Sequence, residues 1–301
     1  MKKQPKYLIL IALFHGMVLS SQQLPQFTQY LYNTVSINPA YAGSRGVLNV
    51  TALHRNQWTG LEGNPKTNTI SIHTPIKFTN IGLGLSYISD NLGFESTNYI
   101  YGDFSYSVPL NDNVNMSFGL KAGLTSYSLE NPDDNDNFFA NNGTLWSPNF
   151  GAGIYMSSQR WFLGISSPRI LNTDLNEGEF MALERNNYFA IGGVVLDLSR
   201  SLKFKPSVIY KFTDGAPATY DVSANFLLYD KLWLGATYRF NFANNIGAII
   251  DYQISKEIRV GYAYDLPTSE FRSYGSGTHE VLLIYEPFRK KSGGIKSPRY
   301  F

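Results

Sequence analysis

The chain has 301 residues, no cysteine and a formal net charge of +2, and 15% of its residues are aromatic. The absence of cysteine excludes disulfides, thiolate metal sites and a cysteine nucleophile. After residue 21 no stretch approaches the roughly 18 consecutive apolar residues of a membrane-spanning helix. If the chain spans a membrane, a closed barrel of strands is the only way left, because every backbone polar group must be paired without water.

Residues 1–21 are typical of a cleaved secretory signal. A basic start at residues 2–6 precedes an apolar run over 7–19, and Ser20 or Ser21 is the expected last residue removed. The run is too short for an anchor helix, which needs about 20 apolar residues. Removal of three lysines leaves 22 of the 25 basic residues against 23 acidic ones. A nucleic-acid partner therefore has no electrostatic support.

From residue 46 onward the sequence alternates with period two and is rich in Tyr, Phe, Val and Ile. In 232–241 the even positions are apolar, whereas the odd ones include Arg239 and Asn241. The same split recurs in 114–125 and 202–211. One face of each strand suits lipid and the other suits a wet interior, which predicts an all-β transmembrane antiparallel barrel in a gram-negative outer membrane.

Segmentation at turn residues predicts fourteen strands, an even number as bacterial single-chain barrels require. Their predicted ranges are 46–56, 67–76, 80–89, 96–110, 114–130, 146–157, 160–168, 185–198, 201–212, 217–229, 232–241, 246–254, 257–266 and 278–286.

The connections between these segments alternate in length. The even-numbered ones have two or three residues, whereas the longest odd-numbered ones are 57–66, 131–145, 169–184 and 267–277. Outer-membrane barrels alternate short periplasmic turns with longer outside loops. This predicts periplasmic termini, with residues 22–45 as a plug or mouth segment, 46–288 as the barrel and 289–301 as a basic tail.

Several predicted strands carry charged residues on the inward face. Their mixed signs favour a filled interior with internal ion pairs over a selective channel. Apolar residues lie on both faces near 47–53, 188–198 and 281–285, which predicts contact with a plug there. The predicted inward charges are Lys121, Lys203, Lys205, Lys211, Arg239, Asp221, Asp251, Arg259 and Asp265.

Four stretches resemble the PorP/SprF family of type IX secretion system membrane proteins: LPQFTQYLYNTVSINPAYAGSRG (24–46), RNQWTGLEGNPKTNTISIHTPI (55–76), NIGLGLSYISDNLGF (80–94) and YAYDLPTSEFRSYGSGTHEVLLIY (262–285). The resemblance implies an outer-membrane barrel of gliding and protein-secreting Bacteroidota. It also implies a partner, either a surface adhesin or another exported protein with a C-terminal sorting domain, and further secretion components. The loops at 131–145 and 169–184 and the basic tail do not resemble the family.

Seven residues are candidates for partner binding. Arg55 lies near the end of the first predicted strand, and Gln57 and Trp58 follow that strand, so an indole and a guanidinium there could bind a peptide. Equally, Trp58 could belong to an aromatic girdle. The others belong to the hexad 38–43, which resembles the family's most recognisable motif and could equally be a plug hinge. They are Asn38, Pro39, Tyr41 and Gly43.

Nothing in the sequence predicts catalysis or a cofactor. His54, His73 and His279 are the histidines left after signal removal, and Glu280 follows His279 on a strand, where neighbours point to opposite faces. The acidic run 133–137 could hold calcium but lacks the Gly and Glu of an EF-hand loop. We expect a non-enzymatic protein of the secretion machinery, and the alternative is a diffusion channel or hydrophobic-ligand transporter.

Overall fold

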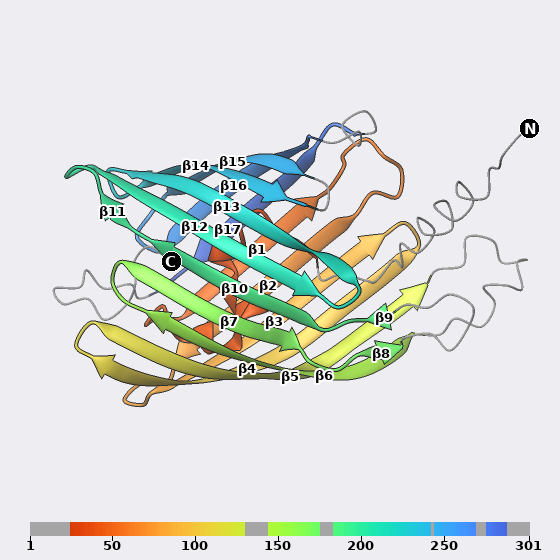
Figure 1. Ribbon diagram of the computed structural model, residues 1–301, viewed down its shortest axis with the longest axis horizontal. Coiled ribbons are helices and arrows are strands. Elements are labelled where there is room, and N and C mark those ends of the chain that lie inside the picture. Colours follow the sequence, from red (N-terminus) through yellow and green to blue (C-terminus); the bar gives the residue numbers. More distant parts are fainter. Residues whose placement is uncertain (1–24, 130–143, 175–182, 242–243, 269–274, 288–301) are drawn as a thin grey trace, which may run out of the picture.

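In the computed structural model the strands form one closed antiparallel barrel with its axis along the long dimension of the molecule (Figure 1). The structure describes residues 25–129, 144–174, 183–241, 244–268 and 275–287. No helix within these ranges has both the length and the apolar character to cross a membrane. The strands of the barrel wall are β1 (Asn49–Asn56), β2 (Lys66–Pro75), β3 (Ile81–Leu92), β4 (Glu95–Asn111), β5 (Val114–Leu129), β6 (Leu145–Ser157), β7 (Trp161–Arg169), β10 (Asn187–Val194), β12 (Leu202–Thr213), β13 (Ala216–Leu228), β14 (Leu232–Phe240), β15 (Asn245–Gln253), β16 (Ile258–Pro267) and β17 (Thr278–Tyr285).

The prediction of fourteen strands is confirmed. Each strand pairs with its neighbours in the chain, and β1 pairs with β17 from Val50↔Tyr285 to Asn56↔His279, which closes the cylinder. Closure leaves the wall without a free sheet edge, so the backbone is paired where lipid offers no partner. Fourteen strands enclose a space wider than side chains of the wall alone fill.

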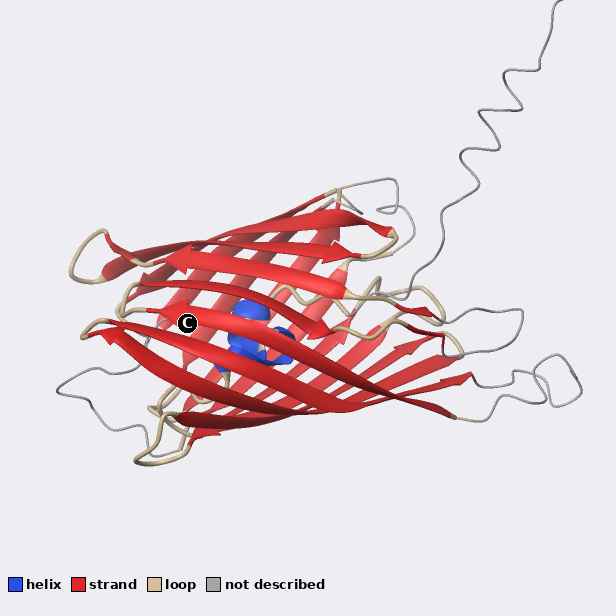
Figure 2. Ribbon diagram, turned by 60° about the horizontal axis from the view of Figure 1, so that its bottom comes forward, coloured by secondary structure: helices blue, strands red, loops and turns tan. Residues whose placement is uncertain are grey.

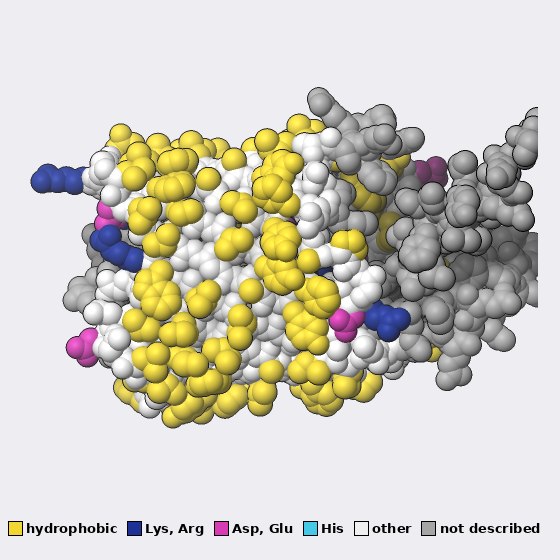
Figure 3. Space-filling model, viewed as in Figure 1, with side chains coloured by type: hydrophobic (Ala, Val, Ile, Leu, Met, Phe, Trp, Pro, Cys, Tyr) yellow, Lys and Arg dark blue, Asp and Glu magenta, His cyan; other side chains and the backbone are white. Residues whose placement is uncertain are grey.

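The outer surface carries an apolar belt, with charged side chains gathered towards its two ends (Figure 3). Alternation puts Leu83, Leu85 and Tyr87 of β3 outside, whereas Ser86 and Ile88 face in. Leu120 on β5 is 63% exposed while its neighbour Lys121 is 3% exposed. This contrast between adjacent residues is the pattern of a lipid-facing wall around a separate interior.

Two local features differ from the prediction. The predicted strand 185–198 is divided at Val195, although the register with β12 is the same on both sides of the gap (Gly193↔Ser207 and Leu196↔Phe204). The gap lies opposite Pro206 of β12, which has no N–H to donate to the ladder. The chain then resumes as β11 (Leu196–Asp197), which pairs with β12. The predicted loop 169–184 contains a small hairpin of β8 (Thr173–Asp174) and β9 (Leu183–Glu184). The acidic run 133–137, the signal and the basic tail lie outside the described residues.

Short helical turns lie inside the barrel (Figure 2). They are η1 (Tyr30–Tyr32), α2 (Thr34–Ile37) and η2 (Pro39–Tyr41), and they belong to residues 25–46, which we call the plug. Each turn is too short to be stable in water, so contacts with the wall must hold the plug in place.

Candidate functional site

The plug extends along the lumen between contacts near its two ends. Gln26 donates to Thr219 near the start of β13 (3.0 Å), at the end of the barrel that carries the long connections. Near the other end of the plug, Arg45 pairs with Glu286, just after β17 (2.7 Å), at the end that carries the short turns. The sequence predicted a plug or mouth segment; the described residues lie inside the barrel, and the first of them lie nearer the end with the long connections.

Glycines on the inner wall make room for the plug backbone. A Cβ at Gly119 of β5 would overlap the backbone of Pro39 and Ala40, and a Cβ at Gly82 of β3 would overlap Ala42. A Cβ at Gly153 of β6 would likewise overlap the side chain of Asn38. Interiors pack to crystal-like density, so no side chain fits at these positions unless the plug moves.

An apolar cluster joins the plug to the wall. Phe27, Tyr30, Val35, Ile37, Ala40 and Tyr41 of the plug are all buried in it. The sequence showed apolar residues on both faces near 47–53, 188–198 and 281–285. The inward residues of these three regions belong to the same cluster, which confirms that those strands contact a plug. These wall residues are Leu53, Phe189, Ile191, Leu282 and Ile284.

Arg55 is the centre of an ion-pair cluster at the long-connection end, which we call the outer cluster (Arg55, Asp265, Glu280 and Thr28). Its Nη1 donates to Glu280 Oε2 (3.0 Å), Asp265 Oδ2 (3.2 Å) and Thr28 Oγ1 (3.0 Å). Glu280 also accepts the backbone N–H groups of Thr28 (2.9 Å) and Gln29 (2.8 Å). The carboxylate of Glu280 therefore ties the start of the plug to β17.

Two further cations, Arg239 and Lys121, hydrogen-bond to the plug backbone. Arg239 forms a bidentate pair with Asp221 (2.7 and 2.9 Å) and donates to Phe27 O (3.4 Å). Lys121 pairs with Asp103 (2.7 Å) and donates to Val35 O (3.3 Å). Such buried cations are tolerated only with partners.

Eight of the nine predicted inward charges are confirmed. Lys121, Lys205, Lys211, Arg239, Asp221, Asp251, Arg259 and Asp265 are all buried. Lys203, near the short-turn end, pairs instead with the largely exposed Asp230 (2.7 Å). Lys205 lies over the rings of Trp233 (4.6 Å) and Tyr32 (5.3 Å), so aromatic faces complete its surroundings.

Five of the seven candidate residues lie inside the barrel. Asn38 and Tyr41 are 1% and 3% exposed, and Pro39 beside them is also buried. Gly43 adopts a left-handed φ of +76°, and its N–H donates to His73 Nδ1 (3.1 Å). Arg55 belongs to the outer cluster and is 2% exposed.

The other two candidates, Gln57 and Trp58, are partly exposed at the rim of the barrel. Their connection is anchored on both sides: Thr59 N–H donates to Gly277 O (2.8 Å), and Gly93 N–H donates to Gly63 O (2.8 Å). Trp58 itself has a positive φ of +52°, which is rare for a bulky residue. These bonds hold the connection that carries Trp58 between the β3–β4 turn and the β16–β17 connection.

Sequence reasoning missed Glu280, Asp103 and the glycines as plug contacts. Their inward positions follow from strand parity, and a glycine on that face signals a close backbone approach. His279 and Glu280 point to opposite faces as predicted: Tyr262, whose hydroxyl lies 2.6 Å from His279 Nδ1, is exposed on the outside, whereas Glu280 is buried.

Asn38→Ala is expected to loosen the middle of the plug. Asn38 Oδ1 accepts the N–H of Ala40 (3.0 Å) and its Nδ2 donates to Ile154 O (3.1 Å), so alanine removes both hydrogen bonds and leaves the buried Ala40 N–H without this acceptor, at a cost of about 1–3 kcal/mol. The midpoint of thermal unfolding, followed by the gel shift of the folded barrel, should fall. Asn80→Ala, at an exposed turn residue, should leave it unchanged; equal midpoints for both variants would contradict this role.

An apolar belt around a lumen filled by the chain's own N-terminal segment defines a plugged outer-membrane β-barrel. The chain belongs to the PorP/SprF family: residues 19–285 match the family described as type IX secretion system membrane protein PorP/SprF. The resemblance found in the sequence and the predicted outer-membrane location are thereby confirmed. No curated protein matches the sequence.

Solved barrels resemble the fold at low identity. Omp33 of Acinetobacter baumannii is 9% identical and covers 80% of this chain and 97% of its own, with a TM-score of 0.48. The CymD monoaromatic hydrocarbon channel is 11% identical, with coverages of 84% and 96% and a TM-score of 0.49. The KdgM porin is 11% identical and covers 79% of this chain and 98% of its own, with a TM-score of 0.39. At such values these likenesses say nothing about what this chain binds.

Proposed function

We propose that this barrel holds an exported protein at the cell surface, through the rim at its long-connection end, as a non-enzymatic part of type IX secretion or gliding. The partner class is an adhesin or another protein with a C-terminal sorting domain. The observation that carries the proposal is the plug, because a lumen packed with the chain's own backbone and side chains leaves no space for a passing polypeptide.

Within this proposal the seven candidate residues divide into two roles. Gln57 and Trp58 contact the partner, because they are the candidates at the rim and tryptophan is a typical interface anchor. Asn38, Pro39, Tyr41, Gly43 and Arg55 act indirectly, by seating the plug and the first strand on which the rim is built.

The test is purification of a tagged chain from its native host in mild detergent, followed by identification of the proteins recovered with it. We expect a sorting-domain protein, and we expect its recovery to fall about tenfold or more in the double variant Gln57→Ser, Trp58→Ser, as for loss of an interface anchor. Trp161→Ser, at the start of β7 and therefore at the short-turn end, is the matched control and should recover as much as the unmodified chain. Absence of any exported protein from the unmodified sample would overturn the proposal.

A further inference from the structure

The amino end of the plug, residues 25–29, is held at the barrel end that carries the long connections. Its hydrogen bonds reach four strands, and each wall partner lies within four residues of the strand end on that side. The partners are Thr219 of β13 for Gln26, Arg239 of β14 for Phe27, and Asp265 of β16 and Glu280 of β17 for Thr28. Long connections lie outside the cell in outer-membrane barrels, so the amino end of the plug lies towards the cell-surface opening.

The carboxyl end of the plug lies at the short-turn end. The N–H of Gly43 donates to Nδ1 of His73, the third residue from the end of β2 (3.1 Å), and Arg45 pairs with Glu286 (2.7 Å). The chain then turns back, because β1 begins at Asn49 and runs towards the long connections. The plug is therefore one inner passage of the chain that precedes the fourteen strands of the wall. An odd number of passages puts the two ends of the chain on opposite sides of the membrane.

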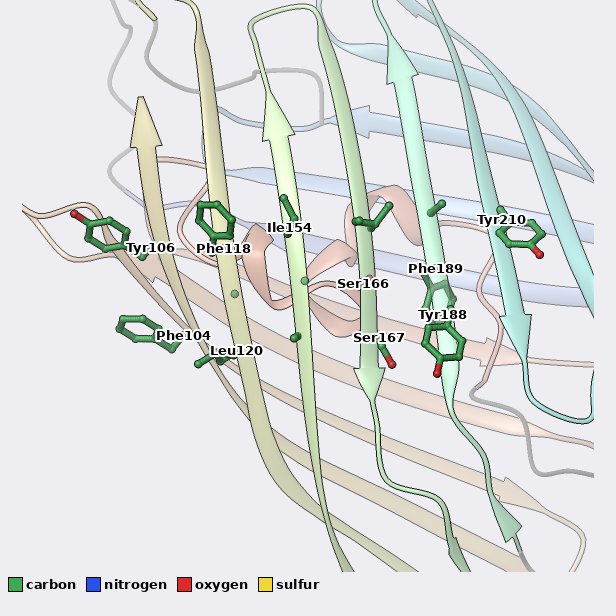
Figure 4. A pocket seen from close by; sticks show the side chains of 15 residues that line it. Phe104, Tyr106, Phe118, Leu120, Ile154, Ser166, Ser167, Tyr188, Phe189 and Tyr210 are labelled. Atoms are coloured by element: carbon green, nitrogen blue, oxygen red, sulfur yellow. The ribbon is translucent and has the colours of Figure 1, made fainter. Parts of the chain in front are cut away.

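The plug is closed off along the sides of the barrel. On the outer wall a groove of about 710 Å³ is lined by small residues of β6, β7 and β10, namely Ala152, Ser167 and Ala190, and Figure 4 shows the turns of the plug behind these strands. The strands themselves are paired in sequence from β5 to β10, and Ser166 of β7 donates inward to Ile37 O of the plug (2.8 Å). A molecule outside the cell therefore reaches the plug only through the opening at the long-connection end.

The start of the processed chain lies within a short reach of Pro25. If the predicted signal is removed after Ser20 or Ser21, four or three residues precede Pro25. An extended chain spans at most about 3.6 Å per residue, so these residues reach at most about 14 Å. The hydrocarbon core of a bilayer is about 30 Å thick. The processed amino terminus therefore cannot return from the long-connection end to the periplasm.

We infer that the amino terminus of the processed chain opens to the cell surface. The carboxyl end stays periplasmic, because Glu286 follows β17 and its N–H donates to Glu257 O in the short turn before β16 (2.8 Å). The sequence predicted both termini in the periplasm, and the inner passage of the plug is the reason for the difference at the amino end. The signal must be removed before the plug is seated, since its apolar run over 7–19 would otherwise project into water. The inference does not depend on the proposed function, because it rests on contacts between plug and wall.

Antibody labelling of intact cells tests the inference. An epitope is inserted between Gln22 and Gln23 in one chain and between Gly293 and Gly294 in a second chain. Both are produced in a gram-negative host without type IX secretion, so that no exported partner covers the opening. Antibodies do not cross the outer membrane, so we expect the first epitope to be labelled fully on intact cells, with no gain on permeabilisation, and the second only after permeabilisation. A folded barrel whose first epitope is labelled only after permeabilisation would overturn the inference.

Single cysteines give a second measurement, which covers the case in which the epitope prevents insertion. The chain has no cysteine of its own. Gln26→Cys marks the partly exposed amino end of the plug, Leu61→Cys marks an exposed residue of a long connection, and Lys77→Cys marks an exposed residue of a short turn. With a maleimide on a polymer too large for porins, Gln26→Cys should react on intact cells, as Leu61→Cys does, and Lys77→Cys only after permeabilisation. Reaction of Gln26→Cys with the side dependence of Lys77→Cys would contradict the inference.

Discussion

Gly119→Val is expected to drive the plug from its seat and open the lumen. The added side chain would overlap the backbone of Pro39 and Ala40, and β5 cannot yield because it is paired on both sides within the wall, so the plug must move. Overpacking a well-packed interior costs about 1–3 kcal/mol, and more where the obstacle is backbone. Without its plug, a fourteen-stranded barrel lies between the small filled barrels and the open porins in width. The variant should therefore conduct ions steadily in planar bilayers, and a protease should reach residues 25–46.

The matched control is Gly102→Val on the adjacent strand β4. A Cβ there faces the outside and meets no atom closer than 3.9 Å, so the plug should stay in place and the lumen should stay closed. Equal conductance for Gly119→Val and Gly102→Val would contradict the role of the glycines. Steady conductance of the unmodified barrel would favour the channel alternative over surface anchoring.

Arg55→Met is expected to release the start of the plug while the barrel stays folded. The substitution leaves Asp265 and Glu280 buried without their shared cation, and breaking such a buried cluster costs about 3–5 kcal/mol. Glu280 holds the N–H groups of Thr28 and Gln29. Hydrogen exchange at these two amides should therefore accelerate by about 100-fold or more.

Arg160→Met is the control for this prediction. Arg160 also forms an ion pair, with its Nη2 2.5 Å from Asp197 Oδ2. The two side chains are 62% and 39% exposed, so water replaces the lost contact. Neither exchange at the plug nor the unfolding midpoint should change. Unchanged exchange at Thr28 in the Arg55 variant would mean that the apolar cluster alone holds the plug.

Neighbouring residues in the sequence determine which side chains of each wall strand face lipid and which face the interior. In β14 the alternation of Leu234 and Ala236 with Thr237 and Arg239 fixes which side faces lipid, because successive side chains of a strand point to opposite faces. The positions of the short turns can likewise be predicted from polar pairs such as Ser199 and Arg200, which separate two segments of alternating apolar and polar residues. These are neighbour-to-neighbour properties, so no tertiary information is needed to read them.

The break at Val195 and the course of the plug could not be predicted in the same way. Val195 fits an extended strand by propensity, and the gap arises because the pairing register brings this part of the strand opposite Pro206 of β12, which has no N–H to donate. The plug contains only short turns without a hydrophobic period. Its position depends on partners more than 200 residues away, such as Glu280 for Thr28.

The sequence by itself determined the membrane barrel, its fourteen strands, the inward charges and the family, because each is carried by local alternation or by a continuous motif. The tertiary structure alone decided that the plug extends along the lumen from Thr219 to Glu286, that Arg55 binds Asp265 and Glu280, and that small residues of three strands make one outer groove. These features arise only when the sheet closes, because closure brings residues from opposite ends of the chain onto one wall and around one space.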